Sequence, residues 1–176
     1  MIVVGALALL LLTAAVVVLF AMVGELSTRI PVPADDPGVA SHSDFIAGAV
    51  MNDWPEALGG LAHRRSATVL VLSSICSTCN SVADELANYR PEKLADIGVV
   101  VSCGVAQVGE DFVGQHSIGH LPHLVDAGGS WVSTNFGVKT SPTALRFQDG
   151  VLVEAYSFSR LEPLLGRIST VLEGVS

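Results

Sequence analysis

The hydrophobic pattern divides the chain into a charge-free N-terminal segment and a longer part in which apolar runs alternate with polar turns. Residues 2–23 contain no charged side chain, and the first charge is Glu25. A helix rises about 1.5 Å per residue, so this segment would span roughly 33 Å, enough for a bilayer core of about 30 Å. We therefore expect residues 1–24 to form a single transmembrane anchor. A cleaved signal peptide or a buried helix is the alternative, but no Lys or Arg precedes the apolar run and Ala21-Met22-Val23 is a poor cleavage site.

Residues 25–45 have the composition of an extended linker. Pro31, Pro33 and Pro37 lie close together, and this density of proline prevents a regular helix. The remaining residues, 46–176, suffice for one domain. The expected organisation is an anchor, a linker and a single globular domain.

Within residues 46–176, short apolar runs typical of buried strands alternate with stretches of helical periodicity. The Asp149-Gly150 pair lies between two apolar runs and predicts a β-hairpin. The expected strands are 68–72, 97–102, 143–147 and 151–156, with a further short apolar piece at 124–125, and the expected helices are 77–89, 110–118 and 161–172. This order, β-α-β-α-β-β-α, predicts an α/β domain with a mixed central sheet flanked by helices.

Composition and charge exclude several classes of protein. Half of the residues are hydrophobic, which excludes a disordered chain, and three cysteines are too few for a disulfide-stapled miniprotein. The formal net charge is −8, and nucleic acid binding needs clustered Lys and Arg, so we expect no nucleic acid partner.

Cys76 and Cys79 form a C-x-x-C pair directly between a predicted strand and a predicted helix. A cysteine at a helix N-terminus faces unpaired backbone N–H groups and the positive end of the helix dipole, and both stabilise a thiolate. Cys79 lies on the same helical stripe as Val82, Ala83 and Leu86, so it is expected to be shielded. One accessible and one shielded thiol suit dithiol–disulfide exchange. A zinc or copper site and an inert pair are the alternatives, although a structural zinc ion needs four ligands.

The cysteine pair is followed about sixty residues later by Ser141-Pro142-Thr143, immediately before a predicted strand. This combination resembles the active site and cis-proline loop of the thioredoxin superfamily. The chain is similar, more narrowly, to membrane-anchored thioredoxin-like proteins of the TlpA and MauD type. The matching residues are Cys76, Cys79, Asp126 with Gly129, Phe136-Gly137-Val138, Ser141-Pro142-Thr143 and Asp149-Gly150.

The resemblance implies a thioredoxin-like fold and a membrane-tethered thiol-disulfide oxidoreductase without a cofactor or metal ion. It implies that Cys76 and Cys79 are catalytic and that the loop of Ser141, Pro142 and Thr143 binds substrate. The implied partners are protein thiols or disulfides and a redox partner protein. A single-pass protein of the cell membrane with an extracytoplasmic domain is implied as well, although the lone flanking Arg29 weakly favours the opposite orientation.

The sequence departs from the family at Leu70, where thioredoxins have a buried acid, and at Ser77-Thr78, which lacks the usual proline.

Four further residues could take part in chemistry. Cys103 follows a predicted strand, and we interpret it as a small buried hydrophobe. His116, His120 and His123 are interpreted as solvated loop residues. Together with the cysteines they would suit copper, so the alternative function is a copper metallochaperone that uses Cys76, Cys79 and one histidine.

Overall fold

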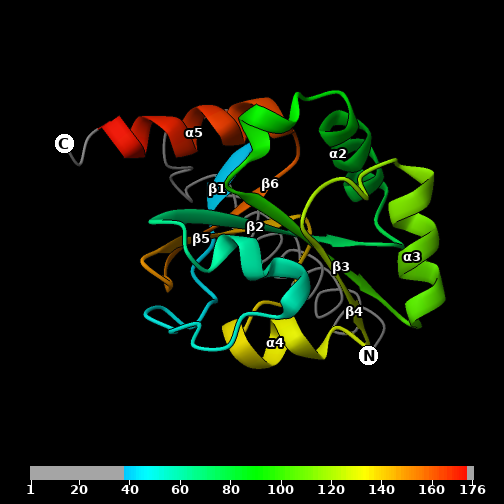
Figure 1. Ribbon diagram of the computed structural model, residues 1–176, viewed down its shortest axis with the longest axis horizontal. Helices are drawn as coiled ribbons and strands as arrows, with labels where there is room; N and C mark the ends of the chain where they lie inside the picture. Colours follow the sequence, from blue (N-terminus) through cyan, green and yellow to red (C-terminus); the bar gives the residue numbers. More distant parts are fainter. Residues whose placement is uncertain (1–37, 174–176) are drawn as a thin grey trace, which may run out of the picture. The chain divides into compact units, whose positions relative to one another are not determined.

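The computed structural model describes residues 38–173, which are organised around one six-stranded mixed sheet (Figure 1). The strands follow the spatial order β1-β6-β5-β2-β3-β4. Strands β2, β3 and β4 are parallel, whereas β5, β6 and β1 are added in antiparallel fashion on the other side of β2. Their bounds are β1 Val39–Ser41, β2 Ser66–Ser73, β3 Ile97–Cys103, β4 His123–Ala127, β5 Thr143–Gln148 and β6 Val151–Phe158.

Helices cover both faces of the sheet, so the core has two halves. Residues of α2, α3 and α5 pack with Leu70 and Leu72 on one face, and residues of η1 and α4 pack with Val69 and Val71 on the other. Figure 1 shows α2 and α5 on the side of the sheet opposite to α4. The bounds are η1 Glu56–Leu61, α2 Ser77–Ala87, η2 Pro91–Leu94, α3 Ala106–Gln115, α4 Ser130–Phe136 and α5 Leu161–Glu173.

The central strand β2 explains why this arrangement forms. Its six inner residues, 67–72, are all buried, because helices cover both of its faces. A strand of this kind reads as a continuous apolar run rather than as an alternating one, and burying each Val or Leu side chain contributes roughly 1.5–3 kcal/mol. The expected α/β architecture with a mixed sheet is confirmed.

The predicted hairpin is also present. Asp149 and Gly150 connect β5 to β6 and have φ angles of 49° and 78°. Positive φ at both positions is the geometry of a type I′ turn, whose twist matches that of the flanking strands. The expected helix at 110–118 instead occupies Ala106–Gln115, and the apolar piece at 124–125 is part of the parallel strand β4.

The short helix α4 is an element that the sequence pattern did not predict. Its seven residues show no extended helical periodicity and lie between glycines. The carboxylate of Asp126 accepts hydrogen bonds from the backbone N–H groups of Trp131 and Val132, at 3.1 Å each. Asp126 is 5% exposed, so this buried carboxylate satisfies donors at the helix start that would otherwise lack partners.

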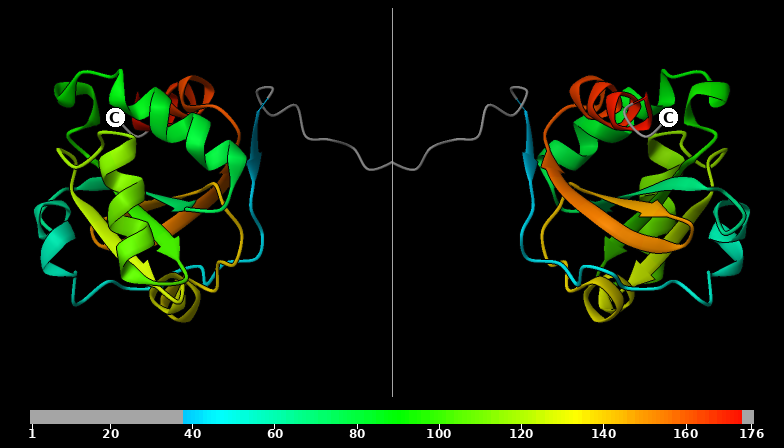
Figure 2. Two further views of the ribbon diagram at one scale, coloured as in Figure 1. Left: turned by 90° about the vertical axis from the view of Figure 1, so that its right-hand side faces the viewer. Right: turned by 90° about the vertical axis from the view of Figure 1, so that its left-hand side faces the viewer.

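The N-terminal boundary of the folded part differs from the expected linker of residues 25–45. Val39–Ser41 form an edge strand that pairs with Tyr156–Phe158 of β6, and Val39 is buried (Figure 2). Three residues of the expected linker, 39–41, therefore belong to the sheet. The predicted anchor at 1–24 lies outside the described residues. Within residues 38–173, no helix is long and apolar enough to cross a membrane.

Candidate functional site

Cys76 lies where β2 passes into α2, at the carboxyl end of the central parallel strand. It is the N-cap residue of α2, with an extended backbone, and its Sγ accepts a hydrogen bond from the backbone N–H of Cys79 at 3.2 Å. The side chain is half-buried. The N–H donor and the helix dipole both stabilise negative charge on this sulfur, which is what a nucleophilic thiol needs.

Cys79 occupies the sheltered side of the same turn. It is completely buried and belongs to the core cluster that contains Val82, Ala83 and Leu86, as the helical spacing predicted. Burial, together with the hydrogen bond to Cys76, raises the pKa of the Cys79 thiol to about 11. The Ser73 backbone and the Ser141 hydroxyl form hydrogen bonds that act in the opposite direction. Cys79 is therefore protonated at neutral pH when both thiols are reduced.

The loop before β5 faces the cysteine pair, and its residue Ser141 lies 65 residues after Cys76 in the sequence. The Ser141–Pro142 peptide bond is cis, and Cys76 Sγ lies 3.7 Å from the carbonyl oxygen of Ser141. Sheet register explains the approach. Thr143 pairs with Val71 in the antiparallel β2–β5 ladder, which places the residues before Thr143 at the carboxyl end of β2.

The three loop residues expected to bind substrate differ in their accessibility. Ser141 is half-buried and contacts the cysteine pair, whereas Pro142 and Thr143 are buried. The Thr143 hydroxyl donates a hydrogen bond to the carbonyl oxygen of Thr140 at 2.8 Å, so this side chain holds the loop together. Of these three residues, Ser141 is thus the one that can present polar side-chain atoms to a bound molecule.

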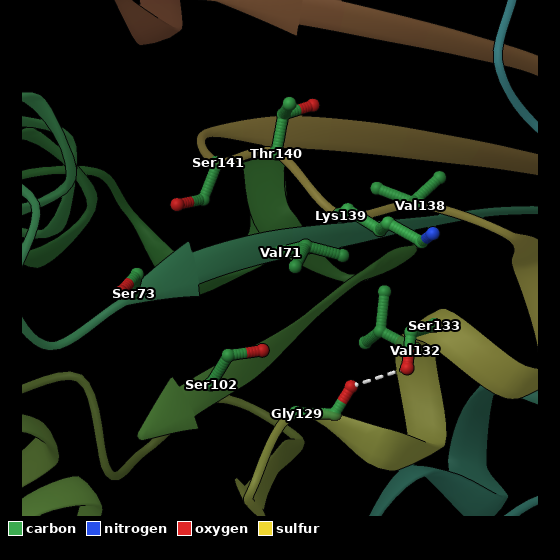
Figure 3. Close-up of a pocket in the computed structure, with 10 residues that line it drawn as sticks. All are labelled: Val71, Ser73, Ser102, Gly129, Val132, Ser133, Val138, Lys139, Thr140 and Ser141. Carbon is green, nitrogen blue, oxygen red and sulfur yellow. Dashed lines mark hydrogen bonds between the residues drawn. The ribbon is translucent and has the colours of Figure 1, made fainter. Parts of the chain in front are cut away.

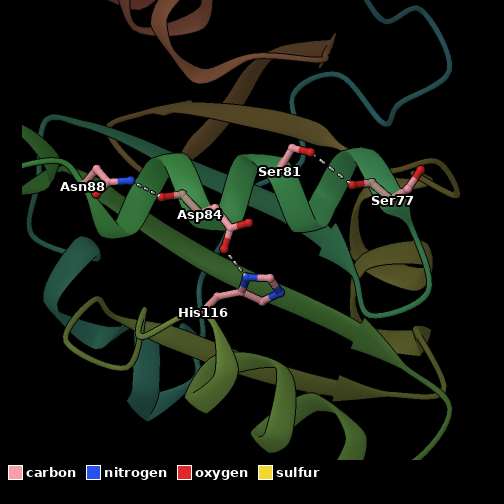
Figure 4. Close-up of polar contacts among 5 residues, drawn as sticks. All are labelled: Ser77, Ser81, Asp84, Asn88 and His116. Atoms are coloured by element: carbon pink, nitrogen blue, oxygen red, sulfur yellow. Dashed lines mark hydrogen bonds and ion pairs between the residues drawn. The ribbon is translucent and has the colours of Figure 1, made fainter.

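Helix α2 is attached to its neighbours by two carboxylates. Asp84 Oδ1 lies 2.7 Å from Nδ1 of His116, at the end of α3 (Figure 4). Glu85 Oε2 accepts a hydrogen bond from the backbone N–H of Leu161, the first residue of α5, at 2.7 Å. These contacts hold the helix that carries both cysteines against α3 and α5.

The interpretation of the three histidines as solvated residues is wrong for His116. Its side chain is 5% exposed and packs against the ring of Phe112, with ring centroids 4.5 Å apart. The helical stripe of α3 brings it under α2, where Asp84 supplies its polar partner. His120 is exposed and His123 is half-buried.

The alternative function, a copper metallochaperone, would use Cys76, Cys79 and one histidine as ligands. Among residues 38–173, no group of three His, Cys, Asp or Glu side chains is arranged to hold a metal ion. Cys103 is 8% exposed, in agreement with its interpretation as a small buried residue, and its Sγ lies 4.0 Å from the carbonyl oxygen of Asp126.

A pocket next to the cysteine pair was not apparent from the sequence (Figure 3). It has a volume of about 260 Å³ and shares Ser141 with the cysteine site. Val71, Val132 and Val138 supply its apolar surface. Its polar lining comes from the ends of β2 and β3, from α4 and from the loop before β5, namely Ser73, Ser102, Ser133, Lys139, Thr140 and Ser141. These residues are scattered in sequence, so no local motif identifies them.

Comparison with solved structures identifies the architecture. The chain is similar to a DsbF homologue from Corynebacterium diphtheriae, with 16% identity, coverage of 78% of this chain and 95% of that one, and a TM-score of 0.52. At this identity the likeness shows the fold. The chain has a thioredoxin-like fold.

Two other solved structures are similar at lower TM-scores. A secreted disulfide oxidoreductase of Mycobacterium tuberculosis shares 20% identity over 71% of this chain and 95% of its own length, with a TM-score of 0.46. The thioredoxin domain of a thiol-disulfide oxidoreductase from Bacteroides vulgatus shares 12% identity over 75% of this chain and 97% of that domain, with a TM-score of 0.49. No protein-family model and no curated protein matches the chain significantly.

Proposed function

We propose that this chain is a thiol-disulfide oxidoreductase that exchanges disulfides with protein substrates through Cys76 and Cys79. The observation that carries the proposal is the arrangement of three groups at one point. Cys76 caps α2 with its sulfur beside a backbone N–H, Cys79 is buried one turn later, and the Ser141 carbonyl lies 3.7 Å from the Cys76 sulfur. An accessible thiol, a sheltered thiol and a backbone acceptor beside them suit attack on a disulfide in an extended polypeptide.

The reaction proceeds in two exchange steps. The Cys76 thiolate attacks one sulfur of the substrate disulfide, so a mixed disulfide forms and the first substrate thiolate leaves and takes up a proton. Cys79 then gives up its proton, and its sulfur attacks the Cys76 sulfur and releases the second substrate thiolate. The substrate gains two electrons and two protons, and the enzyme holds a Cys76–Cys79 disulfide. A redox partner protein reduces this disulfide, or the whole sequence runs in reverse to oxidise a client.

In thioredoxins a buried acid lies near the second cysteine, but this chain has no carboxylate at the corresponding position to accept the Cys79 proton. That position holds Leu70, which is fully buried in the core. Among the described residues, the groups that affect the Cys79 thiol are Cys76, the Ser73 backbone and the Ser141 hydroxyl. The proton therefore passes to water or to the departing substrate thiolate.

The proposal includes the location of the protein. Residues 1–24 anchor the chain in the cell membrane as a single span, and the redox domain acts on the extracytoplasmic side, as in the TlpA and MauD type. The apolar length of residues 2–23 supports the anchor. On intact cells, a membrane-impermeant thiol reagent is expected to label the accessible Cys76; labelling only after the cells are opened would contradict the orientation.

The test of the activity is a trapping experiment with the full-length chain. In cells that produce Cys79→Ser, the first exchange step still occurs and the second does not, so mixed-disulfide adducts accumulate on non-reducing gels. Adding Cys76→Ser is expected to remove every adduct. The matched control Cys103→Ser, at the third cysteine of the chain, is expected to leave the adducts unchanged. Absence of adducts, or adducts that persist without Cys76, would contradict the proposal.

A further inference from the structure

The pocket beside Ser141 lies on the opposite face of the sheet from the helix that carries the cysteines. Helix α2 packs with Leu70 and Leu72, whereas the pocket is lined by Val71 of the same strand and by Val132 of α4. Successive side chains of a strand point to opposite faces. Cys76 and the pocket therefore lie on either side of the loop formed by residues 139–141, and Ser141 borders both.

This placement decides which part of a substrate reaches the pocket. In the proposed function, an extended segment of the substrate pairs with the backbone of Ser141. If the cysteine of that segment points toward Cys76, the next residue in the chain points the other way, because side chains alternate along an extended strand. The pocket thus receives the side chain directly adjacent to the substrate cysteine.

The chemistry of the pocket favours an acidic side chain. Lys139 is the one charged residue among those that line it. The hydroxyls of Ser73 and Ser102 form no hydrogen bond with any described residue, so both can donate to a ligand. Figure 3 places Ser73, Ser102 and Ser141 toward one side of the pocket and Lys139 toward the other. A carboxylate accepts hydrogen bonds from hydroxyl and ammonium donors, and the valines can cover its methylene groups.

We propose that this pocket binds the carboxylate of a Glu or Asp adjacent to the cysteine of the substrate, and so selects acidic cysteine-containing segments. The inference rests on the proposed thiol exchange and adds a substrate preference to it. The protein itself carries a formal net charge of −8, so long-range attraction does not explain such a preference. The preference depends on the positive charge of Lys139, and the serine hydroxyls on the other side of the pocket supply further donors.

The experiment measures kcat/KM for the reduction of synthetic disulfide peptides by the full-length chain in detergent micelles. The peptides are identical except for Glu, Gln or Lys beside the cysteine. The unmodified protein is expected to prefer the Glu peptide over the Gln peptide by about threefold at low ionic strength, the scale of an exposed ion pair. High salt is expected to reduce the preference, because it screens the charges.

Two substitutions distinguish binding in the pocket from a general effect of the protein's charge on the rates. Lys139→Ala is expected to abolish the preference, and Lys139→Glu to shift it toward the Lys peptide. Lys93 is the other lysine of the chain, is exposed and lines a different surface hollow near Tyr89, so Lys93→Ala should keep the preference.

The outcomes distinguish the two proposals. Equal rates for the Glu and Gln peptides, or a preference that survives Lys139→Ala, would overturn the acidic subsite and leave thiol exchange intact. Failure to reduce any of the peptides would overturn the thiol exchange itself, and the subsite with it.

Discussion

Burial of the Cys79 thiol predicts that the stability of the reduced protein falls in a defined range of alkaline pH. Burial is the largest cause of the raised pKa, followed by the hydrogen bond to Cys76, and together they move it from an ordinary 9.0 to about 11. In the unfolded chain the thiol loses its proton near its ordinary pKa. In the folded protein it keeps the proton until about pH 11.

The sign and size of the effect follow from proton linkage. Between pH 9.0 and about 11 the folded state binds more protons than the unfolded state, so the free energy of unfolding decreases as the pH rises. One pKa unit corresponds to about 1.4 kcal/mol, so the Cys79 thiol alone accounts for roughly 2–3 kcal/mol over this range. Below pH 9.0 the thiol is protonated in both states, and its contribution is constant.

The assay is urea denaturation of the full-length chain in micelles, with a reductant present, at several pH values. Cys79→Ala is expected to be less stable than the unmodified protein at about pH 8, because the substitution leaves a cavity in the core. By about pH 11 the difference between the free energies of unfolding of the two proteins is expected to shrink by about 2 kcal/mol. Titrating groups that do not interact with Cys79 occur in both proteins and cancel in the difference, so the remaining change belongs to the Cys76–Cys79 pair.

Val82→Ala provides the matched control, because Val82 is equally buried on the same helix and does not ionise. Its destabilisation is expected to be independent of pH over the same range. A gap for Cys79→Ala that stays constant within about 0.5 kcal/mol would refute the reasoning, since the thiol would then titrate alike in folded and unfolded chains.

Two further predictions concern the loop and the core. The substitution Ser141→Ala removes the hydroxyl that lowers the Cys79 pKa and keeps the backbone carbonyl near Cys76. Quenched-flow mass spectrometry at neutral pH should show that resolution of the mixed disulfide is slowed about fivefold, whereas its formation is unchanged. Equal slowing of both steps would contradict this role of the hydroxyl. In Gly109→Ala the new Cβ would lie 2.5 Å from Val125 Cγ1 and 2.9 Å from Cys103 Sγ, so urea denaturation should show a loss of about 1–3 kcal/mol. The matched Gly114→Ala, in the same helix with open space at its Cβ, should cause no loss, and similar losses for both would contradict the packing argument.

The parts of the site that depend on local structure could be predicted from the sequence. Cys76 precedes the first turn of a helix, and Cys79 shares a helical stripe with Val82, so their different burial follows from helix geometry alone. The Asp149-Gly150 turn is equally local, because its two residues adopt positive φ with little help from the rest of the fold.

Other features required contacts between distant segments. His116 looked like a loop residue, but the end of α3 lies under α2, where Asp84 supplies its hydrogen bond. Val39 looked like part of a linker, but it belongs to a short strand that pairs with β6 at the edge of the sheet. In each case the deciding partner lies elsewhere in the chain or outside the local pattern.

The sequence by itself determined the α/β pattern of the domain and the position of the cysteine pair at the start of a helix, because periodicity and helix capping act over only a few residues. The tertiary structure decided what surrounds that pair. Register between β2 and β5 brings the Ser141 carbonyl to Cys76, and the ends of β2 and β3, with α4, close a pocket beside Lys139. Those contacts span tens of residues, and they exist because a shared core fixes the strands and helices in one arrangement.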